Sequence, residues 1–202
     1  MCKHDPVSRK TVLILVALGA AAAGFTFSTA AKRLQNEEPT AEASIAASPQ
    51  TASLGWRETH GVPGEQLVFS VESLQIVPTG WRVRLALENR SSVAYEVGAP
   101  RTTLDRSFGV MLFSTGRIEE LDDLNASGKL PAVRPAVSYK PSLPAILEPD
   151  ASWEGTISAP GALAAGSWVR IVFGTLVSVG NPPEALGENV VWITDRAYRL
   201  RS

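Results

Sequence analysis

Cysteine and histidine are scarce in the chain, and their scarcity excludes several kinds of site. Cys2 is the only cysteine in 202 residues, so no internal disulfide can form and no thiol nucleophile exists beyond the N-terminus. The two histidines are His4 and His60. His60 is the only one beyond residue 31, so a zinc or copper site made of several imidazoles cannot be assembled there. We predict that His60 is a solvated loop residue ahead of the first strand.

A strong charge imbalance is also missing. The chain has 19 basic and 20 acidic residues and a net charge of −1. This balance indicates neither a nucleic-acid partner nor a polybasic lipid patch. The sequence contains no Gly-x-Ser-x-Gly elbow, and no glycine-rich phosphate loop precedes a helix. A serine–lysine hydrolase would need a buried lysine, whereas Lys129 and Lys140 lie among prolines, where we expect exposure. We therefore predict no catalytic residue, no metal site and no cofactor.

One long uncharged run is present, at residues 11–31. Arg9 and Lys10 precede it, and Lys32 and Arg33 follow it. About 20 apolar residues cross the hydrocarbon core of a bilayer as a helix. The bias of basic residues toward the cytoplasm predicts that residues 1–10 form a cytoplasmic tail and that the rest of the chain is exported. The sequence thus predicts a single-pass membrane protein with an extracytoplasmic domain.

A cleaved signal peptide is the alternative reading of the same run. Its charged region would be residues 1–10, its apolar region residues 12–18, and its cleavage site residues 20–22 or 28–30. The mature domain would then be secreted. The absence of a cysteine after the apolar run excludes a bacterial lipid-anchored cysteine.

Residues 32–54 are rich in Ala, Ser, Thr, Glu, Gln and Pro and contain no aromatic residue. Such a composition buries too little apolar surface to offset its conformational entropy, so we predict a disordered linker. The remaining segment, residues 55–202, has 148 residues, which is close to the commonest size of a single domain. We predict that they form one extracytoplasmic domain.

Apolar and polar residues alternate through most of this domain, which predicts an all-β fold. At residues 81–89, Trp81, Val83 and Leu85 share one face and charged residues occupy the other. In the preceding strand the apolar parity slips by one residue near Glu72 and Ser73, which indicates a bulge or a change of sheet. The expected strands, about seven, cover residues 66–77, 81–89, 93–97, 107–114, 152–158, 167–179 and 189–198. Aromatic residues in these strands are expected to fill the core.

Residues 117–149 interrupt the alternation. Ile118, Leu121 and Leu124 have helical spacing, and Gly128 would stop the helix after one or two turns. Five prolines between residues 131 and 149 then forbid a regular central strand, although short pieces such as residues 136–139 could pair at an edge. We expect specificity to reside in this irregular region.

Three short patterns carry a resemblance. The run Ala165-Gly166-Ser167-Trp168-Val169-Arg170 is similar to the aromatic corner that begins strand F of immunoglobulin-like domains, with Trp168 in place of the usual tyrosine. The run Leu147-Glu148-Pro149-Asp150 with Trp153 resembles the turn before strand E of bacterial surface sandwiches. Residues 66–89 resemble their early hairpin with an asparagine turn. The resemblance, to bacterial extracytoplasmic immunoglobulin-like β-sandwich domains of unknown function, implies the fold and supplies no catalytic residue.

One cluster of carboxylates, formed by Glu119, Glu120, Asp122 and Asp123, is close enough in sequence to suggest a calcium ion. The cluster lacks the alternating spacing and the glycine of a calcium loop, so we read it as the solvated face of a short helix.

The function predicted from the sequence is a binding or structural role. We expect a membrane-anchored extracytoplasmic module of the cell envelope that is not an enzyme. Its partners would be the membrane, through residues 11–31, and an unidentified protein or envelope component, without nucleic acid. The alternative is an envelope or secreted hydrolase that uses carboxylates.

Overall fold

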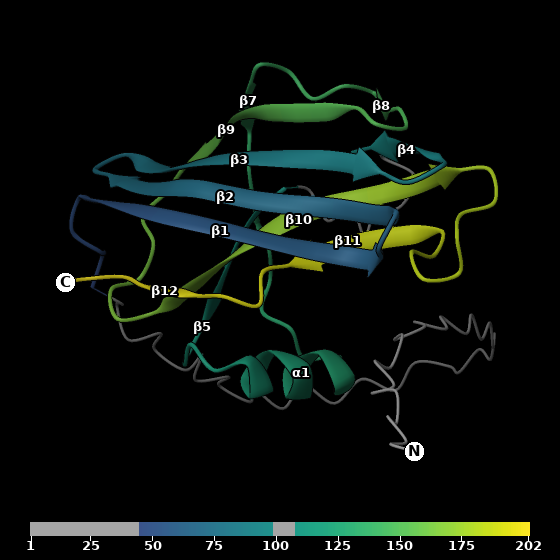
Figure 1. Ribbon diagram of the computed structural model, residues 1–202. Helices are drawn as coiled ribbons and strands as arrows, with labels where there is room; N and C mark the ends of the chain where they lie inside the picture. Colours follow the sequence, from purple (N-terminus) through teal and green to yellow (C-terminus); the bar gives the residue numbers. More distant parts are fainter. Residues whose placement is uncertain (1–44, 99–107) are drawn as a thin grey trace, which may run out of the picture. The chain divides into compact units, whose positions relative to one another are not determined.

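The regular structure of the described residues is almost entirely β-strand. The computed structural model describes residues 45–98 and 108–202, and Figure 1 labels their elements. In chain order the elements are β1 (Gln50–Val62), β2 (Glu65–Val77), β3 (Gly80–Arg90), β4 (Ala94–Val97), β5 (Gly109–Phe113), α1 (Ile118–Ala126), β6 (Arg134–Pro135), β7 (Ser138–Lys140), β8 (Ile146–Leu147), β9 (Ser152–Pro160), β10 (Trp168–Val179), β11 (Asn189–Ile193) and β12 (Tyr198–Arg199). The predicted all-β class is confirmed.

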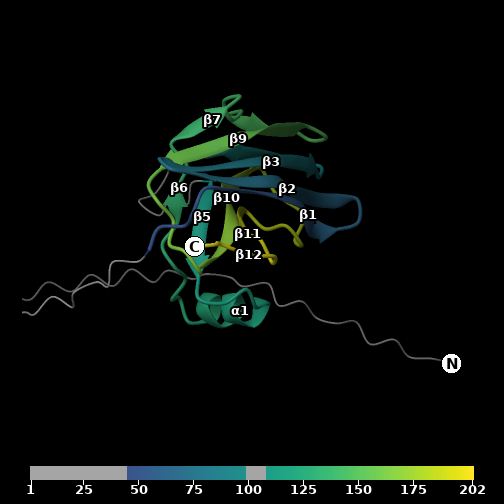
Figure 2. The ribbon, with the colours of Figure 1, turned by 90° about the vertical axis from the view of Figure 1, so that its left-hand side faces the viewer.

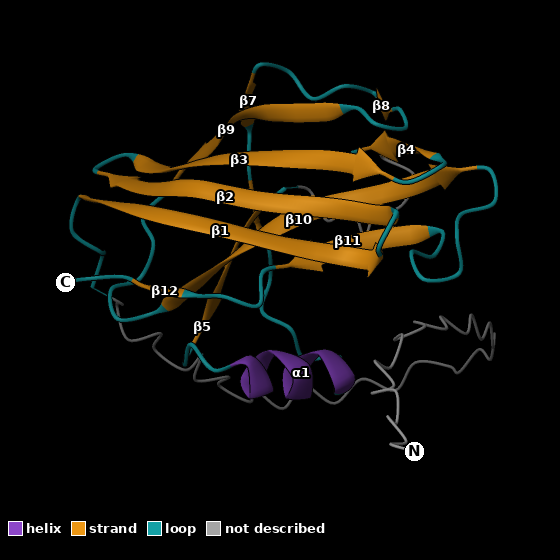
Figure 3. Cartoon of the chain, viewed as in Figure 1, coloured by secondary structure: helices purple, strands orange, loops and turns teal. Residues whose placement is uncertain are grey.

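The strands form two antiparallel sheets. The five-stranded sheet has the order β1-β2-β3-β9-β7. The seven-stranded sheet is built around β10, which pairs with β5 and β4 along one edge and with β12 and β11 along the other. On each edge of β10 two short strands follow one another where a longer strand would otherwise run. Figure 3 shows how strands dominate both layers.

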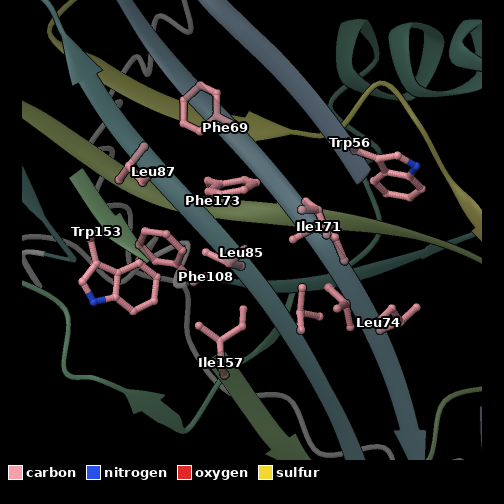
Figure 4. Packing of buried hydrophobic residues seen from close by; sticks show 14 of the residues in the cluster. Trp56, Phe69, Leu74, Leu85, Leu87, Phe108, Trp153, Ile157, Ile171 and Phe173 are labelled. Atoms are coloured by element: carbon pink, nitrogen blue, oxygen red, sulfur yellow. The ribbon is translucent and has the colours of Figure 1, made fainter. Parts of the chain in front are cut away.

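The two sheets pack face to face through apolar side chains. Figure 4 shows the aromatic centre of this core, where the rings of Phe69 and Phe173 come from opposite sheets. Their centroids are 5.0 Å apart, and the Phe108 ring lies 6.0 Å from that of Phe173 and 6.4 Å from that of Trp153. All four side chains are buried. Burial of a large apolar side chain contributes about 1.5–3 kcal/mol, so these contacts hold the sheets together.

The parity slip in the second strand is a β-bulge. Val71 of β2 pairs with Leu85 of β3, and the next pair is Ser73 with Arg84, which leaves Glu72 unpaired. The extra residue keeps apolar side chains on the inner face before and after the bulge, because side chains alternate strictly along an unbroken strand. The bulge was therefore predicted correctly from the sequence.

The predicted boundary between linker and domain is wrong. Residues 50–54 lie in β1, which pairs with β2 on both sides of an irregularity at Leu54 and Gly55, and Ala46 forms a bridge with Ala164. β1 is the edge strand of its sheet, and only Ala52 and Leu54 of these five residues are apolar, so their composition resembles that of a linker. The cytoplasmic tail, the membrane segment and residues 32–44 of the predicted linker lie outside the described residues.

The irregular region forms a helix and short edge strands. α1 spans Ile118–Ala126, and Gly128 follows it with a φ of +67°, a conformation that favours glycine at the end of a helix. β7 pairs with β9 at the edge of the five-stranded sheet, close to where an edge piece was expected. The last predicted strand is divided into β11 and β12 by residues 194–197.

α1 covers the outer face of the seven-stranded sheet. Leu121 packs against Met111, Phe113 and Val172, which point away from the main core. Figure 2 shows the helix lying across this layer, on the side opposite the five-stranded sheet. Both faces of β5 and of the first half of β10 are thus buried.

Candidate functional site

No helix or strand of the described residues covers the outer face of the five-stranded sheet. Residues paired directly across an antiparallel sheet share a face, so the register defines this surface in rows. One row contains Arg57, Ser70, Ala86 and Glu154 in β1, β2, β3 and β9. We call the following residues the open face: Arg57, Ser70, Glu72, Arg82, Arg84, Glu88, Arg90, Glu154 and Thr156.

Arginine–carboxylate pairs cross the open face from strand to strand. Arg84 contacts Glu72 at 2.9 Å on one side and Glu154 at 2.7 Å on the other. All three side chains are more than half exposed, so each pair contributes about 0–1 kcal/mol to stability. Hydrogen bonding to Glu154 and the charges of Glu72 and Glu154 raise the pKa of Arg84 above its ordinary value. These exposed charges therefore contribute little to the stability of the fold.

A second group of pairs surrounds Glu88 on β3. Arg57 Nη1 donates to Glu88 Oε1 at 2.9 Å, and Arg90 Nε donates to Glu88 Oε2 at 2.9 Å. The hydrogen bond from Arg57 lowers the pKa of Glu88, and the contacts of Arg90 act in the same direction against partial burial. Arg82, at the other end of β3, is exposed and forms no ion pair among the described residues.

An open depression of about 550 Å³ lies where the open face reaches the end of β3. Gln66, Glu88, Arg90, Asp150 and Ser152 contribute to its lining. Its size falls in the range of small-ligand sites, but its lining is polar and lacks the apolar wall that such sites have. Glu88 already holds two guanidinium groups and is kept ionised, whereas a general acid needs a raised pKa. Glu88 therefore lacks the raised pKa that a general acid needs.

The predicted carboxylate cluster lies on α1, and its members differ in surroundings. Glu119, Asp122 and Asp123 are exposed, as predicted for a solvated helix face. Glu120 instead turns back and accepts hydrogen bonds from the Thr115 amide at 2.8 Å and the Thr115 hydroxyl at 2.7 Å, and from Ser114. Burial acts to raise the pKa of Glu120, but these hydrogen bonds outweigh burial and lower it. Glu120 therefore fastens the start of α1, and among the described residues no group of three or more His, Cys, Asp or Glu side chains could hold a metal ion.

The prediction that His60 is a solvated loop residue is wrong. His60 lies in β1, is half-buried, and its Nε2 is 3.1 Å from the carbonyl oxygen of Leu186. Its ring centroid is 5.6 Å from that of Trp192. Two residues earlier, Glu58 accepts hydrogen bonds from the Trp192 indole at 2.8 Å and the Asp195 amide at 2.9 Å. These inward polar side chains join β1 to β11 and were missed because no apolar alternation marks the first strand.

A buried arginine was also missed. Arg170, on β10, is fully buried beneath α1, with its guanidinium 5.2 Å from the Phe113 ring. Its Nη1 donates to the carbonyls of Thr194, at 2.8 Å, and Asp195, and its Nη2 to those of Gly116, at 3.2 Å, and Arg117, at 2.8 Å. Desolvation lowers the pKa of Arg170, and the charge of Asp195 opposes that effect. The side chain ties the approach to α1 and the break between β11 and β12 to the central strand.

Lys129 and Lys140, the lysines that a serine–lysine hydrolase could use, are both exposed. Lys129 follows α1, and Lys140 ends β7 in the row of Thr156 and Arg84. Neither has the burial that such a hydrolase requires of its lysine.

No helix within residues 45–98 and 108–202 has the length and hydropathy needed to cross a bilayer, and the predicted span at residues 11–31 lies outside these residues. No family model matches the chain, and neither does any curated protein or any solved structure.

Proposed function

We propose that the chain is a membrane-anchored module of the cell envelope whose extracytoplasmic domain binds a partner and does not catalyse a reaction. The observation that carries the proposal is the asymmetry of the two sheets. α1 covers the outer face of one sheet, whereas the outer face of the other presents an array of arginine, glutamate, serine and threonine side chains. Arginine is enriched where proteins bind one another, and a charged surface favours contact with a partner of complementary charge.

We further propose that the domain is an immunoglobulin-like sandwich. Strands β2-β3-β9-β7 have the neighbours of strands A, B, E and D in that fold, and β5-β10-β11 those of C, F and G. β1 is then an added strand beside A. Trp168 is the first residue of β10, the position of the aromatic corner, and packs against Gly116, where a side chain would collide with its ring.

A binding role agrees with the ionisation of the carboxylates. The pKa values of Glu88 and Glu120 are both lowered by their hydrogen-bond donors. A carboxylate hydrolase needs one carboxyl group with a raised pKa as its general acid. The carboxylates of the open face stand in ion pairs on a flat sheet, where water has free access.

Membrane fractionation tests the anchoring, and cross-linking of the intact, membrane-inserted protein followed by pull-down tests the binding. We expect the full-length chain in the membrane pellet after a carbonate wash, its domain accessible to protease from outside the cytoplasm, and one specific cross-linked partner. Full-length protein free in the cytosol would refute the anchoring. Anchored protein without any cross-linked partner would refute the binding role.

A further inference from the structure

The end of the domain at which the chain enters from residue 44 carries exposed arginines. Ile45 is 74% exposed and, with Tyr198, Arg199 and Arg201, lines an open groove of about 730 Å³. Arg134 lies nearby, because its Nη1 donates at 3.0 Å to the carbonyl of Ala162, in the loop that Ala46 joins through its bridge to Ala164. We call Ile45, Arg134, Tyr198, Arg199 and Arg201 the basic end.

The basic end carries a net positive charge, because its three arginines outnumber the one carboxylate, that of Ser202, which lines the same groove. Arg134, Arg199 and Arg201 are exposed, and none of them forms an ion pair among the described residues. No aspartate or glutamate lines the groove. Ile45 and Tyr198 add an apolar and an amphipathic side chain of the kind that lies well at a membrane–water interface.

The opposite end of the domain is acidic. Figure 1 shows the β1–β2 turn and the β10–β11 connection at the end away from the C-terminus. The acidic residues near these connections and the turn before β9 are Glu65, Glu148, Asp150, Glu184 and Glu188. The 13 residues of β1 run from one end to the other, about 40 Å at the rise of a strand. Although the net charge of the chain is near zero, positive and negative charges therefore lie at opposite ends of the strands.

We propose that the basic end rests on anionic lipid headgroups of the bilayer that holds residues 11–31 of the same chain. The proposal depends on the proposed membrane anchoring. Residues 32–44 connect the apolar segment to Ile45, and a chain of that length spans at most about 45 Å when fully extended. The tether thus keeps the basic end near the surface, and within a Debye length of about 8–10 Å the arginines are attracted to anionic lipids.

Headgroup contact would fix the direction in which the domain points. The acidic end is repelled by the same surface, so the strands stand away from the bilayer and the open face is presented sideways. Each basic residue near an anionic surface favours contact about fivefold. Removal of Arg199 and Arg201 together should then reduce the ratio of seated to unseated domains about 25-fold, from the same contribution per residue.

Energy transfer between the domain and the bilayer surface tests this orientation. The full-length chain with Cys2→Ser is reconstituted in vesicles of phosphatidylcholine, with or without phosphatidylglycerol, that contain an acceptor-labelled lipid. A donor dye is attached at Ser202→Cys, at the basic end, or at Gly64→Cys, in the β1–β2 turn. R199Q/R201Q is compared with R57Q/R90Q, which removes the same charge from the open face.

We expect phosphatidylglycerol to increase transfer from position 202 and to decrease transfer from position 64, and salt or R199Q/R201Q to abolish both changes. R57Q/R90Q should behave as the unmodified chain. Transfer that is independent of phosphatidylglycerol in a chain that co-floats with the vesicles would overturn the headgroup contact and leave the anchoring intact. A chain that fails to co-float would overturn the anchoring and, with it, the headgroup contact.

Discussion

The outer faces of the two sheets use the same kind of side chain in opposite ways. On the five-stranded sheet, Arg84 lies in solvent between two carboxylates, each of which is also exposed. On the seven-stranded sheet, Arg170 is fully buried beneath α1 and binds four backbone carbonyls. An exposed arginine adds little stability and remains available to a partner, whereas a buried one organises the chain around it. The comparison separates a surface whose arginine holds the fold together from one whose arginine stays in solvent.

The largest expected effect comes from the buried arginine. Arg170→Ala leaves four carbonyls without their donor and creates a cavity under α1, so we expect the free energy of unfolding to fall by about 3–5 kcal/mol. Arg84→Ala, the matched change on the open face, should cost less than about 1 kcal/mol. Urea denaturation of the two variants measures the difference, and equal losses would show that burial does not distinguish the two arginines.

The next largest effect on stability is expected from a substitution in α1, the helix that covers the seven-stranded sheet. Leu121 is 7% exposed and is the buried residue of α1. Leu121→Ala should lower the free energy of unfolding by about 2–4 kcal/mol, because it removes buried methyl groups and loosens the cover over Met111 and Phe113. Hydrogen exchange should accelerate in α1 while β2 and β3 remain protected. If hydrogen exchange accelerated equally in both sheets, α1 would unfold together with the sheets and not as a separate unit.

The buried side chain of Tyr95 allows the core between the two sheets to be tested by changing the pH. Its side chain is buried, its hydroxyl has no hydrogen-bond partner in the described residues, and desolvation raises its pKa to about 12. Because the folded pKa exceeds the ordinary value of about 10, stability is fully present below pH 10 and is lost as the pH rises toward 12. The loss should amount to about 2–3 kcal/mol, since one pKa unit corresponds to about 1.4 kcal/mol.

The Tyr95→Phe variant is the control for that loss. It removes the ionisable group and leaves no buried partner unsatisfied, so its stability at pH 7 should match or exceed that of the parent chain. Denaturation curves from pH 8 to pH 12 would show a smaller decline for the variant. An identical decline in both proteins would place the titrating group elsewhere.

The smallest effect concerns the open face itself. Glu154→Gln removes one of the two carboxylates that flank Arg84, and both side chains are more than half exposed. The change in stability should stay within about 0.5 kcal/mol and should vanish at high salt, because exposed pairs are screened. Partner binding should weaken in the same variant. If the variant lost more stability than binding, the ion pairs of the open face would serve to stabilise the fold and not to bind a partner.

The sequence was a good guide wherever side chains alternate. The strands β2 and β3 and the bulge at Glu72 follow from the spacing of apolar residues alone. β1 could not be found that way, because its inner face includes Glu58 and His60, whose partners on β11 and in the loop before it lie more than 120 residues away in the sequence. The role of Arg170 was hidden because its partners are backbone carbonyls 24 to 54 residues away, which no side-chain pattern marks. The composition of the open face could not be predicted, because it depends on the register of four strands and no single strand specifies that register.

The most direct test of the account compares cross-linking from the two faces in the membrane-inserted protein. A photo-reactive amino acid is placed at Ser70 or Thr156 on the open face, and at Glu119 or Asp123 on the exposed side of α1. We predict a discrete adduct with one partner from the open-face positions, lost in Arg84→Glu, and none from the helix. A discrete adduct from the helix, with none from the open face, would contradict the account.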